Sequence, residues 1–174
     1  PSDPADDLPV YDDNLCDVEV GDIWQLGPHR LMCGDSLDPS SVSALMDGRL
    51  ARMIFTDPPY NVPIHGFVGG KGKIKHREFA MASGEMSEER FTSFLKTSFQ
   101  NQANHSVDGS IHFVCMDWRH VKEIEAAGIE VYSELKNLIV WVKDNGGMGT
   151  FYRSRHELIF AFKYGTAAHI NSFE

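Results

Sequence analysis

A short apolar run that stops at two prolines constrains the fold of this chain more than any other feature. Residues 51–55 read Ala-Arg-Met-Ile-Phe, a mostly apolar stretch of the kind that a buried parallel strand shows. Pro58 and Pro59 follow soon after, and each proline ring locks φ and removes a backbone N–H. The sequence therefore predicts a strand that ends at Asp57 and leaves the sheet through a stiff bend.

The bend brings several hydrogen-bond acceptors together. A residue before proline is restricted to extended geometry, so the carbonyls of Asp57 and Pro58 are expected to point outward beside the Asp57 carboxylate. An NH₂ group can donate one proton to the carboxylate and one to a carbonyl. Two such acceptors favour a pyramidal nitrogen and stabilise the charge that develops when it attacks a methyl group. The segment is predicted to hold and activate an exocyclic amine.

Tyr60 adds an aromatic face to this segment. A nucleobase reaches such a site only after leaving its stack, and stacking on an aromatic side chain is worth roughly 1–3 kcal/mol per base. The alternative interpretation is a strand followed by a proline turn with a surface tyrosine.

The four residues Asp57-Pro58-Pro59-Tyr60 resemble the catalytic motif of DNA methyltransferases that modify the amino group of adenine (N6) or cytosine (N4). Residues 23–36 (IWQLGPHRLMCGDS) are similar to the hairpin and Gly-Asp segment before this motif, in the subgroup where it precedes the cofactor motif. Residues 156–165 (HELIFAFKYG) are similar to the late strand of that subgroup. The aspartate favours adenine, because cytosine-N4 enzymes more often have serine there.

The resemblance implies S-adenosylmethionine as cofactor and DNA as partner. It makes Asp57, Pro58, Pro59 and Tyr60 the catalytic residues, and it implies that Asp35 and Asp57 contact the cofactor. For Asp35, a role as a turn or helix-capping residue is equally open. Restriction-modification is one biological role that fits, beside phage-defence and cell-cycle roles.

The cofactor-binding F-x-G-x-G turn of this family is not found in the sequence. Gly69, Gly70 and Gly72 form the only dense glycine cluster, but Lys71 stands where the second glycine belongs. We therefore expect the chain to be the N-terminal catalytic half of an enzyme that needs its C-terminal half for activity. Without that half, an unpaired strand edge is expected, which favours self-association, including a homodimer. A noncatalytic fragment that binds DNA or a partner remains the alternative function.

Two loops carry the residues expected to contact DNA. Residues 61–84 are too long and polar for a plain connection, and a basic run there suits phosphate contacts. Residues 144–155 combine glycines with aromatic and basic side chains, which suits a flipped base. The alternatives are a solvated charge run in the first loop and packing of Phe151 or Tyr152 against the sheet in the second. The predicted DNA contacts are Asn61, Lys71, Lys73, Lys75, Arg77, Tyr152, Arg153 and Arg155.

Several other residues are of types that occur in active sites, but their sequence context predicts a structural role. Asp117 follows an apolar run and is predicted to cap a helix. His156 and Glu157 are predicted to support the last strand, because methylation of an amine needs no strong base. The cysteines, Cys16, Cys33 and Cys115, are too widely spaced for a disulfide framework or a metal site. We expect no metal, a core position for Cys115, and a reducing cytoplasm as the setting.

The net charge of −9 comes from the start of the chain. Residues 1–38 hold ten acidic side chains and only Arg30 as a base, whereas residues 39–174 hold fifteen of each sign. The lead segment is rich in Asp and Pro without periodicity, so residues 1–20 are predicted to be an acidic linker or arm. Residues 21–174 are predicted to be the catalytic part of the methyltransferase domain.

The pattern of this domain predicts an α/β fold. Asp38 and Ser87 are expected to cap helices, and strands are expected at residues 111–116, 138–142 and 158–162. The order strand, helix, strand, helix, strand and then two strands predicts a Rossmann-like, doubly wound, mostly parallel sheet with an antiparallel edge hairpin, in incomplete form. In such sheets, ligands bind outside the carboxyl ends of the strands.

Overall fold

The computed structural model describes residues 18–63, 80–144, 146 and 151–169. It forms two compact units, residues 1–35 and residues 36–174, and each is described by itself. The membrane search covers the same described residues and gives no helix with the length and apolar character needed to cross a bilayer.

The first unit contains a β-hairpin. β1 (Ile23–Leu26) pairs antiparallel with β2 (His29–Met32), and Gly27 adopts a φ of +60° in the turn between them. Two backbone hydrogen bonds close the open end, from Gly21 N to Cys33 O at 2.8 Å and from Cys33 N to Asp22 O at 3.1 Å. The predicted hairpin is confirmed.

The second unit is built on a four-stranded sheet with the strand order β3-β4-β6-β5. The strands are β3 (Ala51–Thr56), β4 (Ser106–Met116), β5 (Glu134–Val142) and β6 (His156–Lys163). β3 and β4 are parallel, whereas β6 is antiparallel to both β4 and β5. The sheet is therefore mixed, with a larger antiparallel share than predicted among the described strands, because β6 inserts between β4 and β5.

The helices begin where the capping residues predict. Asp38 accepts hydrogen bonds from Ser40 N (3.0 Å) and Ser41 N (3.2 Å) at the start of α1 (Pro39–Met46). A hydrogen bond from the Ser40 hydroxyl, together with these backbone bonds and one from the Ser41 hydroxyl, lowers the pKa of the Asp38 carboxyl to about 2. Ser87 caps α3 (Glu88–Asn104), and a 3₁₀ turn, η2 (Trp118–His120), leads into α4 (Val121–Val131).

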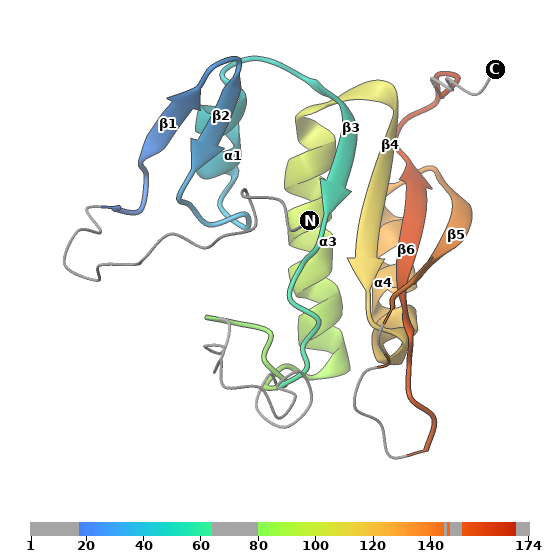
Figure 1. Cartoon of the computed structure of the whole chain (residues 1–174). Coiled ribbons are helices and arrows are strands. Elements are labelled where there is room, and N and C mark those ends of the chain that lie inside the picture. Colours follow the sequence, from blue (N-terminus) through green and yellow to red (C-terminus); the bar gives the residue numbers. More distant parts are fainter. Residues whose placement is uncertain (1–17, 64–79, 145, 147–150, 170–174) are drawn as a thin grey trace, which may run out of the picture. The chain divides into compact units, whose positions relative to one another are not determined.

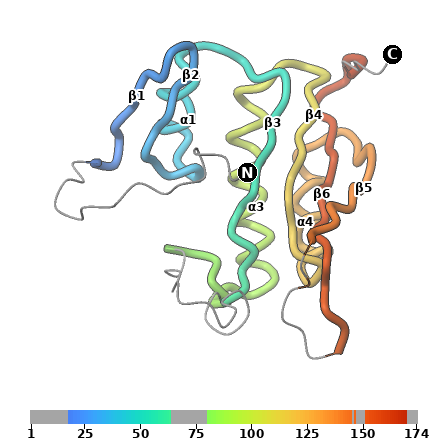
Figure 2. Tube along the Cα trace, in the orientation of Figure 1, coloured from blue at the N-terminus to red at the C-terminus, as the bar shows by residue number. Residues whose placement is uncertain are grey.

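α3 and α4 pack on one face of the sheet, behind it in the views of Figures 1 and 2. The core between these layers is rich in aromatic side chains, and the ring of Tyr132 stacks on that of Phe162 at 4.9 Å. Gly128 lets α4 approach this pair, since a Cβ there would lie 2.5 Å from the Phe162 ring. The fully buried side chains of the core include Phe91, Leu95, Phe99, Val114, Met116, Ile124, Phe160 and Phe162.

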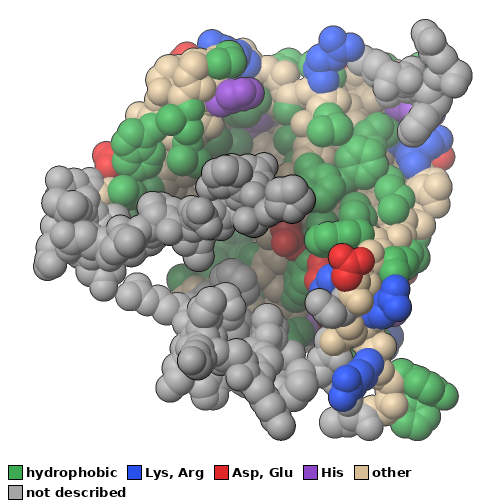
Figure 3. Space-filling view, viewed as in Figure 1, with side chains coloured by type: hydrophobic (Ala, Val, Ile, Leu, Met, Phe, Trp, Pro, Cys, Tyr) green, Lys and Arg blue, Asp and Glu red, His purple; other side chains and the backbone are tan. Residues whose placement is uncertain are grey.

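The opposite face of the sheet is open in the described part of the chain. Hydrophobic side chains spread over this face in the space-filling view (Figure 3). Met53 and Phe55 of β3 are 60% and 62% exposed. β3 pairs only with β4, so its other edge is unpaired among the described residues.

Candidate active site

Asp57 stands at the end of β3, as predicted, since the strand stops at Thr56. Its carboxylate is exposed, whereas Pro58, Pro59 and Tyr60 are half-buried. The carboxyl end of β3 lies beside that of its parallel neighbour β4, and antiparallel β6 begins at the same edge of the sheet (Figure 1). This edge brings together side chains that are far apart in the sequence.

The Tyr60 hydroxyl lies between two carboxylates. It donates a hydrogen bond to Oδ1 of Asp57, and its second partner, Oε2 of Glu157, is 3.3 Å away. Burial, the hydrogen bond to Asp57 and the two negative charges raise the pKa of Tyr60 far above its usual range. The side chain is therefore a neutral phenol whose single O–H proton can serve one carboxylate at a time.

Glu157 is held in place from its other side. Its Oε1 forms an ion pair with Lys143, which directly follows β5. The backbone of Lys143 is fixed in turn, because its N–H donates to Arg155 O at 2.7 Å and its carbonyl accepts from Arg155 Nε at 3.0 Å. Acidic and basic side chains lie close together over the lower ends of the strands in Figure 3.

Cys115 lies behind these groups in β4 and is 3% exposed. Burial, together with the charges of Asp57 and Glu157, raises the pKa of its thiol to about 11. The thiol therefore stays protonated at neutral pH, and a thiolate nucleophile is not available there. The predicted core position of Cys115 is confirmed.

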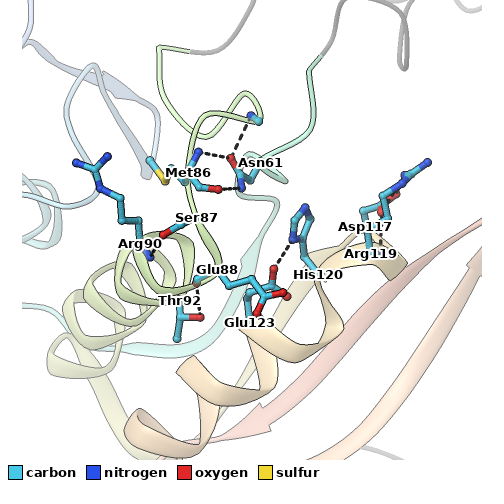
Figure 4. A network of polar contacts seen from close by, with 11 residues as sticks. Asn61, Met86, Ser87, Glu88, Arg90, Thr92, Asp117, Arg119, His120 and Glu123 are labelled. Atoms are coloured by element: carbon cyan, nitrogen blue, oxygen red, sulfur yellow. Dashed lines mark hydrogen bonds and ion pairs between the residues drawn. The ribbon is translucent and has the colours of Figure 1, made fainter.

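Asn61 ties the end of the proline motif to the segment before α3 (Figure 4). Its Oδ1 accepts from Gly84 N (3.0 Å) and Met86 N (3.1 Å), and its Nδ2 donates to Met86 O (2.9 Å). Asn61 is 8% exposed and has a φ of +53°, a conformation that asparagine tolerates better than most residues. The structure thus gives this side chain an anchoring role, and its contact with DNA stays a prediction.

The other predicted DNA contacts divide into two groups. Lys71, Lys73, Lys75 and Arg77 lie outside the described residues. Tyr152, Arg153 and Arg155 are exposed on the β5–β6 loop, and Phe151 and Tyr152 are 88% and 81% exposed. Neither aromatic ring is therefore buried against the sheet, and the contact of this loop with DNA stays a prediction. Asp35, the predicted cofactor contact, is exposed at the end of the first unit.

Asp117 caps η2, as its sequence context indicates. Its Oδ1 accepts from Arg119 N at 2.9 Å, and both carboxylate oxygens accept from Arg119 Nη1 at 3.0 Å (Figure 4). His120 Nδ1 lies 2.7 Å from Oε1 of Glu123 in the same network. The polar side chains of this network therefore form hydrogen bonds with one another, which agrees with a structural role.

The sequence analysis missed Lys143, which pairs with Glu157 at this edge of the sheet. The predicted structural role of Glu157 is compatible with this ion pair, and its Oε2 also faces Tyr60. The available signal was the position of both charges at strand ends on the ligand-binding edge of the sheet. No group of three or more metal-ligating side chains occurs among the described residues.

Comparison with known proteins identifies the family of the chain. The family model N6_N4_Mtase, described as DNA methylase, matches residues 51–173. The chain therefore belongs to this DNA methylase family. The mixed sheet with its helices has α/β character.

One similar solved structure is titled "crystal structure of M1.HpyAVI-SAM complex". It is 15% identical, with a TM-score of 0.45, and the match covers 75% of this chain and 52% of that one. The chain thus spans about half the length of that structure. No curated protein matches the chain.

Proposed function

We propose that this chain carries the catalytic half of an S-adenosylmethionine-dependent DNA methyltransferase that modifies the N6 amino group of a flipped-out adenine. The observation that carries the proposal is the exposed Asp57 carboxylate, placed at a strand end by two prolines with Tyr60 beside it. Membership in the DNA methylase family supports the same chemistry.

In the proposed reaction, one N–H of the adenine amino group donates a hydrogen bond to Asp57 and the other to a carbonyl of the proline bend, and the nitrogen releases one proton after it has accepted the methyl group. These acceptors orient the nitrogen lone pair toward the methyl group and stabilise the positive charge that develops on the nitrogen. The aromatic face of Tyr60 stacks on the extruded base. The cofactor supplies the electrophilic methyl group when it is bound.

The basic run Lys71, Lys73, Lys75 and Arg77, together with Tyr152, Arg153 and Arg155, is proposed to hold the DNA. Exposure of the last three on the β5–β6 loop supports this assignment. Asp35 and Asp57 are proposed to contact the cofactor. The part of the protein that carries the F-x-G-x-G turn is the proposed intramolecular partner, with a homodimer as a further assembly, and the cytoplasm is the proposed location.

The test is methyl transfer by the whole gene product from labelled S-adenosylmethionine to DNA, followed by hydrolysis and analysis of the nucleosides. We expect N6-methyladenine, and Asp57→Ala should lower kcat about a hundredfold or more. Glu125→Ala, an exposed carboxylate on α4, is the matched control and should retain full activity.

Two other outcomes have defined meanings. N4-methylcytosine as the product would assign the alternative base, which the same pair of acceptors can hold. DNA binding with no methyl transfer by the whole gene product would identify a noncatalytic binding module instead.

The isolated chain is proposed to be inactive and to bind S-adenosylmethionine weakly, because its sequence lacks the cofactor turn. Calorimetry on residues 1–174 checks this directly. A micromolar dissociation constant would contradict it.

A further inference from the structure

The Tyr60 hydroxyl occupies one oxygen of the carboxylate that the proposed mechanism uses. Oδ1 of Asp57 accepts a hydrogen bond from this hydroxyl in the structure, so an amino group that binds at Oδ1 has to compete with Tyr60 for it. Displacing a half-buried hydroxyl without offering another acceptor would leave its proton unsatisfied, which is unfavourable. The site therefore needs a second acceptor within reach of Tyr60.

Glu157 meets this requirement. Its Oε2 is 3.3 Å from the Tyr60 oxygen, so a small movement of the hydroxyl transfers its hydrogen bond from one carboxylate to the other. The two acceptors come from different strands, since Asp57 follows β3 and Glu157 belongs to β6. The second acceptor is therefore independent of the segment that binds the base.

Lys143 keeps Glu157 ready for this role. It pairs with Oε1 and leaves Oε2 toward Tyr60. The Glu157 side chain is 22% exposed, so its ion pair with Lys143 is only partly hydrated. The ladder between β5 and β6, in which Trp141 is opposite Glu157, fixes the strand that carries the carboxylate.

We propose that Glu157 is a positioning residue that takes over the hydrogen bond of the Tyr60 hydroxyl when a base enters, which frees Oδ1 of Asp57 for the amino group. The inference rests on the proposed function and adds a resting state to it. In that state, Tyr60 holds Oδ1 of the exposed Asp57 carboxylate. With a base bound, Tyr60 is anchored on Glu157 and presents its ring for stacking.

The alternative is that Glu157 and Lys143 only fasten the β5–β6 loop. The two interpretations differ in how they respond to removal of the Tyr60 hydroxyl. If Glu157 acts through that hydroxyl, Tyr60→Phe makes Glu157 dispensable, because nothing then competes for Asp57. If Glu157 acts on the loop, its loss has the same effect with either side chain at position 60.

The experiment is a double-mutant cycle in the whole gene product, with kcat, KM for DNA and melting temperature measured for each variant. We expect Glu157→Ala to lower kcat about tenfold to a hundredfold, with KM and melting temperature little changed. Adding Tyr60→Phe should restore kcat to the level of Tyr60→Phe alone.

Two controls complete the design. Glu134→Ala removes the carboxylate of a Glu134–Lys136 ion pair (3.0 Å) at the other end of β5 and should leave kcat unchanged. Lys143→Met should lower kcat less than Glu157→Ala, because the acceptor oxygen stays in place.

An equal loss of kcat from Glu157→Ala with Tyr or Phe at position 60, or no loss at all, would overturn the proposal. An unaltered protein that binds DNA but transfers no methyl group would instead refute the proposed function. The two failures are therefore distinguishable. Fluorescence of 2-aminopurine at the target base reports base extrusion in every variant and should be retained in Glu157→Ala.

Discussion

The side-chain amide of Asn61 binds both backbone polar groups of Met86, with Nδ2 2.9 Å from the carbonyl oxygen and Oδ1 3.1 Å from the nitrogen. Since Asn61 directly follows Tyr60, this contact fixes the far end of the proline motif, while β3 fixes its near end. The catalytic segment is thereby held between two anchors.

Asn61→Ala should therefore destabilise the protein. The change leaves the backbone groups of Met86 and the N–H of Gly84 without their partner, which costs about 1–3 kcal/mol. Urea unfolding measures the loss. Asn104→Ala is the control. This exposed side chain at the end of α3 accepts a hydrogen bond from Gln100, and its loss should change stability by less than about 0.5 kcal/mol. Equal losses in the two variants would argue against the anchor.

The ring of Tyr60 and its hydroxyl should have separable effects on DNA binding. Tyr60→Phe keeps the aromatic face and should bind DNA with an extruded target base almost as tightly as the unaltered protein. Tyr60→Ala loses the stacking surface and should bind about 5-fold to 150-fold more weakly, which corresponds to roughly 1–3 kcal/mol. Fluorescence anisotropy with DNA that carries a mismatch at the target adenine gives both constants. Equal affinity of the Phe and Ala variants would exclude a stacking role.

His112 should make the stability of the fold depend on pH. It is fully buried, with Nδ1 3.1 Å from the Tyr132 hydroxyl and Nε2 3.1 Å from Ser110 Oγ. Burial lowers its pKa from 6.5 to about 4, so the unfolded chain binds more protons than the native protein between these values. The free energy of unfolding should therefore fall as the pH drops from about 6.5 to about 4, by about 3 kcal/mol in total.

The measurement is the urea midpoint at a series of pH values. His112→Gln should flatten the dependence between about pH 4 and 6.5. His105→Gln, at the end of α3, leaves the buried histidine in place and should keep the original slope. An unchanged slope in His112→Gln would show that other groups control the acid response.

The unpaired edge and exposed face of β3 should cause the isolated chain to associate with itself. Met53 and Phe55 are largely exposed on a strand that pairs on one side only, and such edges recruit other strands. Light scattering of residues 1–174 should show a mass that rises with concentration. Phe55→Lys should suppress this rise. Ile129 on α4 is 79% exposed and lies outside the sheet, so Ile129→Lys should not suppress it. A mass independent of concentration in the unaltered chain would contradict the prediction.

Local patterns in the sequence account for the elements that were predicted well. β3 ends at Thr56, shortly before Pro58 and Pro59, because neither proline can continue a ladder or a helix. Asp38 and Ser87 begin α1 and α3 because their side chains accept from backbone N–H groups two or three residues ahead. The four-residue motif likewise depends on neighbours in the chain, and its catalytic role stays a prediction.

The contacts between distant segments could not be predicted from local sequence patterns. β4 and β5 are longer than their apolar runs suggested, because pairing with neighbouring strands extends them into polar residues. The insertion of β6 between β4 and β5 depends on tertiary packing, and it alone brings Glu157 to Tyr60 across 97 positions of sequence. Spacing along the chain therefore predicted the stiff bend and a chemistry for it. Only the folded sheet could show that Tyr60 lies between two carboxylates, because hydrogen bonds form between neighbours in space.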